Sequence, residues 1–137
     1  VQTCALPICV NMNSTKNFNI NEFSCHCGCG KNLIDQRVIN MCQLIRDRIK
    51  EPVKINSGYR CPVHNAKVGG VANSNHVKGL AADLSCSSGA KVLFAVIADM
   101  KAKGELPDLE YAILYIAKNF VHIDCGQKRS KYFEVRA

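Results

Sequence analysis

The stretch Ser74-Asn75-His76-Val77-Lys78-Gly79-Leu80-Ala81-Ala82-Asp83 runs from a polar loop into an apolar segment. Residues 80–84 are predicted to form a buried strand, because a short apolar run after turn-forming residues is typical of one. The stretch therefore places an imidazole, His76, on a loop and a carboxylate, Asp83, on the strand that follows. Both side chains are of kinds that bind metal ions.

A second histidine that could join this pair is His122, in the segment Phe120-Val121-His122-Ile123-Asp124. Two imidazoles and one carboxylate, with a fourth position open to water, form a usual arrangement of catalytic zinc. Spacing along the chain does not show whether the three side chains meet. From the residues alone, a zinc site and unrelated roles for His76, Asp83 and His122 remain equally open.

Residues 35–50 form the clearest predicted helix upstream of this stretch. Its apolar side chains recur at helical spacing and make one face: Val38, Met41, Cys42, Ile45 and Ile49. Pro52 is expected to end the helix, because proline disfavours helical geometry in the residue before it. Residues 53–56 are predicted to be a short strand. Residues 57–78 show no periodicity, and we expect an ordered active-site loop, since loops this long are usually functional or disordered.

The downstream part of the chain predicts a second helix and three more strands. Residues 90–103 repeat the amphipathic pattern, and Gly104 is a suitable C-terminal stop. Residues 111–116, 120–125 and 132–135 have the pattern of strands joined by short turns, so we expect them to be antiparallel. The fold class predicted is α+β, with two or three helices packed on a mainly antiparallel sheet.

The length of 137 residues suits one compact domain. Residues 1–8 resemble the translation of a sequencing-adapter oligonucleotide and are set aside from fold reasoning. We expect residues 1–11 to be a non-native or disordered leader, Met12 to be the natural start, and residues 12–137 to form a single domain. A native N-terminal tail is the alternative.

Composition and charge narrow the classes of partner. No run approaches the ~20 consecutive apolar residues of a membrane span, so we expect no membrane association. The segment after Met12 is polar and shows no signal peptide, which favours synthesis in the cytoplasm. The net charge of +7 would suit nucleic acid or an anionic cell wall, but no nucleic-acid-binding motif accompanies it. We expect a monomer that does not bind nucleic acid.

Nine cysteines are many for this length, and two of them precede Met12. The odd remainder and the absence of an export signal favour reduced thiols over disulfides. The motif Cys25-His26-Cys27-Gly28-Cys29 lacks the second cysteine pair of a usual structural zinc site, which favours a packed or redox-sensitive turn over a metal site. We expect His64 to order its loop rather than to bind metal.

Residues 74–83 match the signature Ser-x-His-x-x-Gly-x-Ala-x-Asp at every defined position. Upstream stand Ser57-Gly58-Tyr59-Arg60, Cys61-Pro62-Val63-His64-Asn65 and Val68-Gly69-Gly70. With these motifs, roughly residues 18–126 resemble the zinc D-Ala-D-Ala peptidase family and its phage or prophage branch. That family includes D,D-carboxypeptidases, vancomycin-resistance dipeptidases and phage L-alanyl-D-glutamate endolysins. The resemblance implies the fold shared by D,D-peptidases and the hedgehog signalling domain.

The resemblance also implies the site and its cofactor. His76, Asp83 and His122 would hold Zn²⁺, which lowers the pKa of a bound water and polarises the carbonyl under attack. Arg60 would bind a substrate carboxylate or the polarised scissile carbonyl, since a guanidinium offers forked donors. We expect Ser74 to buttress the loop on the substrate side rather than act as nucleophile, because a nucleophile needs a free base beside it.

The general base is where the sequence departs from part of the family. Several members carry an acidic residue three positions before the last histidine, where this chain has Asn119. Residues two apart on a strand share a face, so Asp124 can point with His122 and is expected to be the base or to orient a ligand. A buried structural carboxylate is the alternative role of Asp124.

The function expected is hydrolysis of peptide bonds in peptidoglycan stem peptides, as in endolysins. D-Ala-D-Ala carboxypeptidase and L-Ala-D-Glu or cross-link endopeptidase activities remain equally open. The absence of a visible signal peptide favours a phage lysis or tail-associated enzyme acting at the bacterial cell wall. Because of Asn119, a non-catalytic zinc-containing binding module, as in the hedgehog domain, is the alternative.

Overall fold

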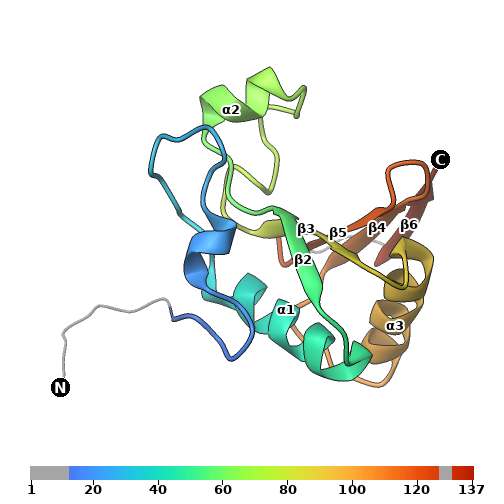
Figure 1. The fold of residues 1–137 in the computed structure, drawn as a ribbon. Coiled ribbons are helices and arrows are strands. Elements are labelled where there is room, and N and C mark those ends of the chain that lie inside the picture. Colours follow the sequence, from blue (N-terminus) through green and yellow to red (C-terminus); the bar gives the residue numbers. More distant parts are fainter. Residues whose placement is uncertain (1–12, 127–130) are drawn as a thin grey trace, which may run out of the picture.

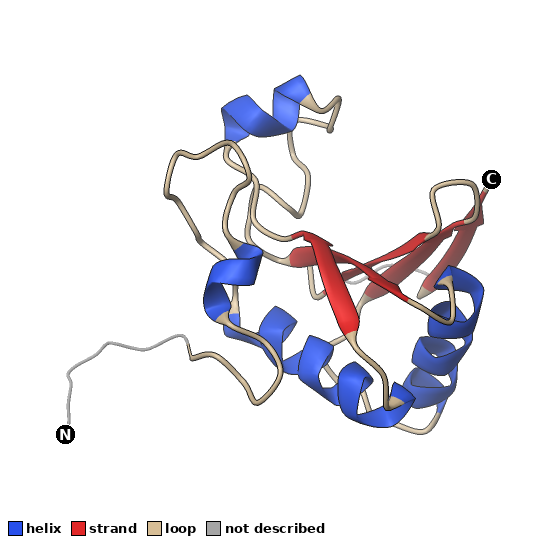
Figure 2. Ribbon diagram, in the orientation of Figure 1, coloured by secondary structure: helices blue, strands red, loops and turns tan. Residues whose placement is uncertain are grey.

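The computed structural model describes residues 13–126 and 131–137, so the predicted leader at 1–11 lies outside the described residues. Figures 1 and 2 show helices packed against one sheet. The helices are η2 (Ile20–Phe23, a 3-10 helix), α1 (Gln36–Ile49), α2 (Pro62–Lys67) and α3 (Ala90–Ala102). The strands are β2 (Val53–Ser57), β3 (Ala81–Cys86), β4 (Tyr111–Tyr115), β5 (Phe120–Asp124) and β6 (Phe133–Arg136). The predicted α+β class is confirmed.

The sheet has the strand order β2-β3-β5-β4-β6. The first four strands in this order pair in the antiparallel sense, as expected. The expectation that β6 is also antiparallel to its neighbour is wrong, because β6 pairs with β4 in parallel. Strand β5 already has a neighbour on each side. Asp124, the last residue of β5, lies opposite Tyr111, the first residue of β4. Strand β6 begins beside this same end of β4, at Ala112, and therefore runs in the same direction as β4.

Two long helices, α1 and α3, cover one face of the sheet (Figure 1). The Asp35 carboxylate accepts the N–H of Arg37 and caps α1, as a short acidic side chain does at this position. The helix ends at Ile49, and its C-cap residue, Lys50, takes a left-handed conformation with φ 60°. Helix α3 packs on β3, β4 and β5. The core between helices and sheet is a continuous apolar cluster.

Alternation along β3 and β5 places the chemically active residues on the opposite face. Leu84, Val121 and Ile123 are fully buried in the cluster beneath the helices. Asp83 and His122 alternate with them and therefore project from the face that α1 and α3 leave uncovered.

The segment 57–78, expected to be a loop without regular structure, contains α2. Pro62 occupies the first helical turn and the Cys61 thiol accepts the N–H of His64, which starts the helix. Six residues make too few turns to show a period in the sequence. Helix α2 lies apart from α1 and α3, near the N-terminal loop of residues 24–35, which connects η2 to α1 (Figure 1). None of the described helices is long and apolar enough to cross a membrane.

Candidate metal centre

Asp83 and His122 are direct partners in the β3–β5 ladder, and their side chains meet on the uncovered face of the sheet. Asp83 Oδ1 lies 3.0 Å from Nδ1 of His122 and 3.2 Å from Nε2 of His76. One ligand atom from each residue lies within 4.8 Å of the others. The structure therefore brings together the three residues that the sequence singled out.

His76 is held at both ring nitrogens. Its Nδ1 lies 2.8 Å from the carbonyl oxygen of Gly58, which can only accept a hydrogen bond. Nδ1 therefore carries a proton, and Nε2 is the ring nitrogen that faces Asp83. The side chain is 2% exposed. Ser74 supports this arrangement, since its hydroxyl oxygen accepts the backbone N–H of His76 at 3.2 Å.

His122 is oriented by a second carboxylate. Its Nε2 lies 2.8 Å from Oδ2 of Asp124, which is 1% exposed and whose Oδ1 accepts the N–H of Gly126. Donation from Nε2 to Asp124 turns Nδ1 towards Asp83 and leaves this nitrogen as the one that a metal ion would bind. Sequence reasoning placed Asp124 on this face, and the side chains of Asp124 and His122 do meet there.

The charges at the centre are those of a cation site. Burial opposes ionisation of Asp83, but hydrogen bonds from His122 and His76 outweigh it and hold the pKa of Asp83 well below its usual value. Burial would also lower the pKa of His122, but hydrogen bonds with Asp124 and Asp83 raise it to about 9. Both shifts follow from the demand of the buried Asp83 carboxylate for positive charge beside it, a demand that a metal ion would meet.

The donor set fits zinc. Ligand atoms bonded at about 2.0–2.1 Å to a tetrahedral zinc ion lie about 3.3–3.4 Å apart. The separations of 3.0 and 3.2 Å around Asp83 Oδ1 are close to this value. Two imidazole nitrogens and one carboxylate oxygen are donors that zinc prefers, and each imidazole has the supporting hydrogen bond usual for a ligand.

Arg60 points its guanidinium at the same centre. Its Nη2 lies 3.8 Å from Asp83 Oδ2, Nη1 donates to Asn65 Oδ1 at 2.8 Å, and Nε donates to the Ser57 hydroxyl at 3.3 Å. These contacts hold the Arg60 guanidinium at the rim of the centre, where its N–H groups can bind an anionic or polarised oxygen.

The comparison with known protein families agrees with this geometry. The family model described as Peptidase M15 matches residues 16–124, most of the chain. The chain belongs to the peptidase M15 family. Peptidases of this family are zinc-dependent metallopeptidases that act on peptidoglycan peptides. A comparison with curated proteins gave no match.

Beside the three residues lie two cavities of about 450 and 350 Å³ that share lining residues and together make a cleft. His122 and Ser74 line both parts, while Arg60, His76 and Asp83 line the second. Four cationic side chains line one part or both: Arg60, Lys78, Lys118 and Arg136. The cleft therefore favours ligands that carry negative charge.

Asn65 is a residue beside the metal centre whose role sequence reasoning missed. It is 2% exposed, its Oδ1 accepts from Arg60, and its Nδ2 donates to the Val71 carbonyl at 2.7 Å. A Cβ on Gly70 would lie 2.1 Å from Asn65 Oδ1, so Gly70 leaves the room for this contact. The sequence signal is the motif Cys61-Pro62-Val63-His64-Asn65, whose last residue makes these contacts.

Asn119, whose position holds an acidic residue in part of the family, has a different task here. It takes φ 56° in the turn between β4 and β5, and its Oδ1 accepts the N–H of Ala90 at 2.8 Å. This bond satisfies a free donor at the start of α3, whose N-cap residue, Gly89, has no side chain for it. The Asn119 side chain is thus occupied by the helix cap.

Proposed function

We propose that this protein is a zinc-dependent peptidase that hydrolyses peptide bonds in peptidoglycan stem peptides. The observation that carries the proposal is the convergence of one ring nitrogen each of His76 and His122 on the ionised Asp83. A proton or a metal ion has to lie between the ring nitrogens and the carboxylate, because three acceptors would otherwise repel one another. A cation site at the floor of a cleft lined with positive charge is suited to an acidic peptide.

His76, Asp83 and His122 would hold the zinc through Nε2, a carboxylate oxygen and Nδ1. When bound, zinc supplies the Lewis acidity that activates water for attack on a peptide carbonyl at neutral pH. The protein's own residues keep the donors in place. Gly58 and Asp124 fix the two imidazole tautomers, and the buried side of the sheet keeps the strands in register.

Arg60 would bind the substrate. Its guanidinium stays charged at all relevant pH values, so it can receive a stem-peptide carboxylate or stabilise negative charge that develops on the scissile carbonyl oxygen. Ser74 lines the cleft but already accepts a hydrogen bond from the His76 backbone. We assign it to supporting the loop on the substrate side.

Asp124 would act through His122 rather than on the substrate. Both its oxygens are engaged, one by His122 and one by the Gly126 N–H, and its side chain is almost fully buried. Of the two roles expected for Asp124, this geometry favours orienting a ligand over accepting a proton from water. Asp124 is therefore proposed as a positioning residue.

The test is digestion of purified peptidoglycan by the zinc-loaded protein, with mass analysis of the released peptides. We expect release that stops with chelator, returns with zinc and is lost in His122→Ala. The fragment masses would separate carboxypeptidase from endopeptidase cleavage. Stoichiometric zinc binding with no bond cut in any wall type would favour the non-catalytic binding module instead.

We propose that residues 12–137 form one monomeric domain that acts at the bacterial cell wall, in the manner of phage lysis or tail-associated enzymes. The net charge of +7 supports attraction to an anionic wall.

A further inference from the structure

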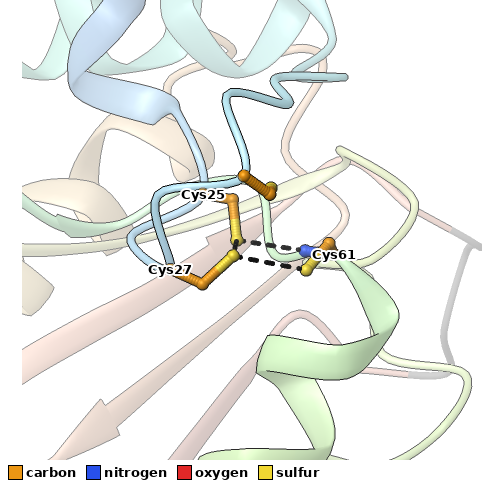
Figure 3. A group of neighbouring side chains, drawn as sticks. Cys25, Cys27 and Cys61 are labelled. Atoms are coloured by element: carbon orange, nitrogen blue, oxygen red, sulfur yellow. Dashed lines mark hydrogen bonds between the residues drawn. The ribbon is translucent and has the colours of Figure 1, made fainter.

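Four cysteines from two separate segments meet away from the metal centre described above. Cys25, Cys27 and Cys29 lie in the N-terminal loop, and Cys61 comes 34 residues after Cys27, at the start of α2. Figure 3 shows the sulfurs of Cys25, Cys27 and Cys61 pointing toward one another. The four Sγ atoms all lie within 4.8 Å of one another.

The sulfur separations are those of a shared tetrahedral ion. Cys25 Sγ lies 3.4 Å from Cys27 Sγ, which lies 3.6 Å from Cys61 Sγ. A disulfide would bring two sulfurs to about 2.0 Å. Thiolates bonded at about 2.3 Å to a tetrahedral zinc ion lie about 3.8 Å apart. The seven cysteines of the described residues are all free, so none of the four is committed elsewhere.

The backbone around the cluster is arranged to direct N–H groups at sulfur. Cys61 N–H donates to Cys25 Sγ, Lys31 N–H to Cys29 Sγ and His64 N–H to Cys61 Sγ, each at 3.4 Å. Such bonds stabilise the negative charge of metal-bound thiolates.

Two glycines shape the loop that carries three of the thiols. Gly28 and Gly30 take φ +84° and +77°, and a Cβ on either would meet nothing within 4 Å. Glycine is therefore needed at both positions for the left-handed turn and not for space. The turns bring Cys27 and Cys29 back beside Cys25 within five residues of chain.

We propose that Cys25, Cys27, Cys29 and Cys61 bind a second zinc ion, in a structural centre whose four thiolates leave no open position. The sequence favoured a packed turn because the motif has no second cysteine pair nearby. The fold supplies the fourth ligand from the segment that also carries Arg60. This inference is independent of the proposed function.

The centre would tie the N-terminal loop to the active-site segment. Tyr59 N–H donates to the Phe23 carbonyl at 2.8 Å, and Arg60 N–H donates to the His76 carbonyl at 3.1 Å. A Cβ on Gly58 would lie 2.7 Å from the Phe23 backbone, so the two segments touch closely there. A metal bound by Cys61 and the loop of residues 25–29 would fix the segment that carries Arg60 into the cleft.

The test counts the zinc bound to the full chain prepared under reducing conditions. Cys27 and Cys29 are exposed, so Cys27→Ser and Cys29→Ser remove ligands without opening the core. We expect about two zinc ions per chain in the wild type and about one in the Cys27→Ser/Cys29→Ser variant. The matched control is Cys86→Ser, outside the cluster, which should keep both ions.

A thiol-specific mercurial separates the two centres. It should release one zinc ion from the wild type and from His76→Ala, and none from the double cysteine variant. Loss of zinc at the histidine site alone would count against the proposed function and leave this inference standing. Equal zinc in the double variant and the wild type, iron in place of zinc, or thiols that hold no metal would overturn the inference.

Cobalt(II) offers a second measurement on the wild type that needs no variant. Cobalt in a four-thiolate site gives strong sulfur-to-metal charge-transfer absorption, and zinc should abolish it by displacement. Absence of that absorption in a folded, reduced chain loaded with cobalt would contradict the proposal.

Discussion

The buried carboxylate of Asp124 lies 2.8 Å from Nε2 of His122 and thereby turns Nδ1 of the same ring towards Asp83. The hydrogen bond fixes both the tautomer and the rotation of the ring. A residue two positions along the strand thus determines which nitrogen faces the proposed metal.

Asp124→Asn tests this relationship. We expect zinc affinity to fall about 10–100-fold, because loss of a carboxylate behind a ligand histidine typically has that effect. Competition with a chromogenic chelator measures the affinity, and hydrolysis at saturating zinc should largely recover. The control is Asp108→Asn, at an exposed carboxylate. Unchanged zinc affinity with a loss of kcat that saturating zinc does not restore would instead make Asp124 the general base.

Arg60→Lys tests substrate binding by the guanidinium. Lysine keeps the charge but not the fork that Asn65 and Ser57 hold in place, so we expect kcat/KM to fall about 10–100-fold, as for loss of one hydrogen bond to a charged group. Zinc content should not change. Arg37→Lys, in an exposed ion pair with Asp35, is the matched control. Wild-type kinetics in Arg60→Lys would remove Arg60 from the substrate site.

Asn119→Asp tests whether this position serves catalysis. Aspartate can accept the N–H of Ala90 and tolerates positive φ, so stability should be within about 0.5 kcal/mol of the wild type. Because the side chain is committed to α3, we expect kcat to stay unchanged in the peptidoglycan assay. A rise in kcat of about tenfold or more would show that a carboxylate here can reach the reacting water.

Gly79 and Gly104 offer a matched pair for stability, since both have φ +74°. Gly104→Ala should cost only the left-handed penalty of about 1–2 kcal/mol, because nothing lies within 4 Å of its Cβ. Gly79→Ala should cost clearly more, since its Cβ would lie 1.9 Å from the Leu33 carbonyl oxygen. Urea denaturation measures both free energies of unfolding. Equal losses would show that the loop at Leu33 gives way without cost.

Much of the fold could be predicted because its signals are local. The helix at 36–49 has an apolar face and a capping Asp35, and the strands at 53–57 and 81–86 follow turn residues. Helix α2 was missed because six residues show no period. The prediction that β6 is antiparallel was wrong, because the neighbour of a strand depends on which edge of the sheet is free. No local sequence pattern encodes that edge.

In the candidate site too, local patterns could be read from the sequence and contacts between distant residues could not. Spacing alone could not bring His76, Asp83 and His122 together, and the signature carried that prediction. The β3–β5 register that pairs Asp83 with His122 is a contact between residues far apart in the chain. The contact of Cys61 with Cys25, Cys27 and Cys29 also joins residues far apart in the chain. It could not be predicted, because it depends on the fold and not on a local pattern.

Zinc binding by His76, Asp83 and His122 can be seen directly by anomalous diffraction at the zinc edge from crystals of the zinc-loaded protein. We expect a peak about 2.0–2.1 Å from His76 Nε2, a carboxylate oxygen of Asp83 and His122 Nδ1. Crystals that contain zinc but show no peak between these three side chains would contradict it.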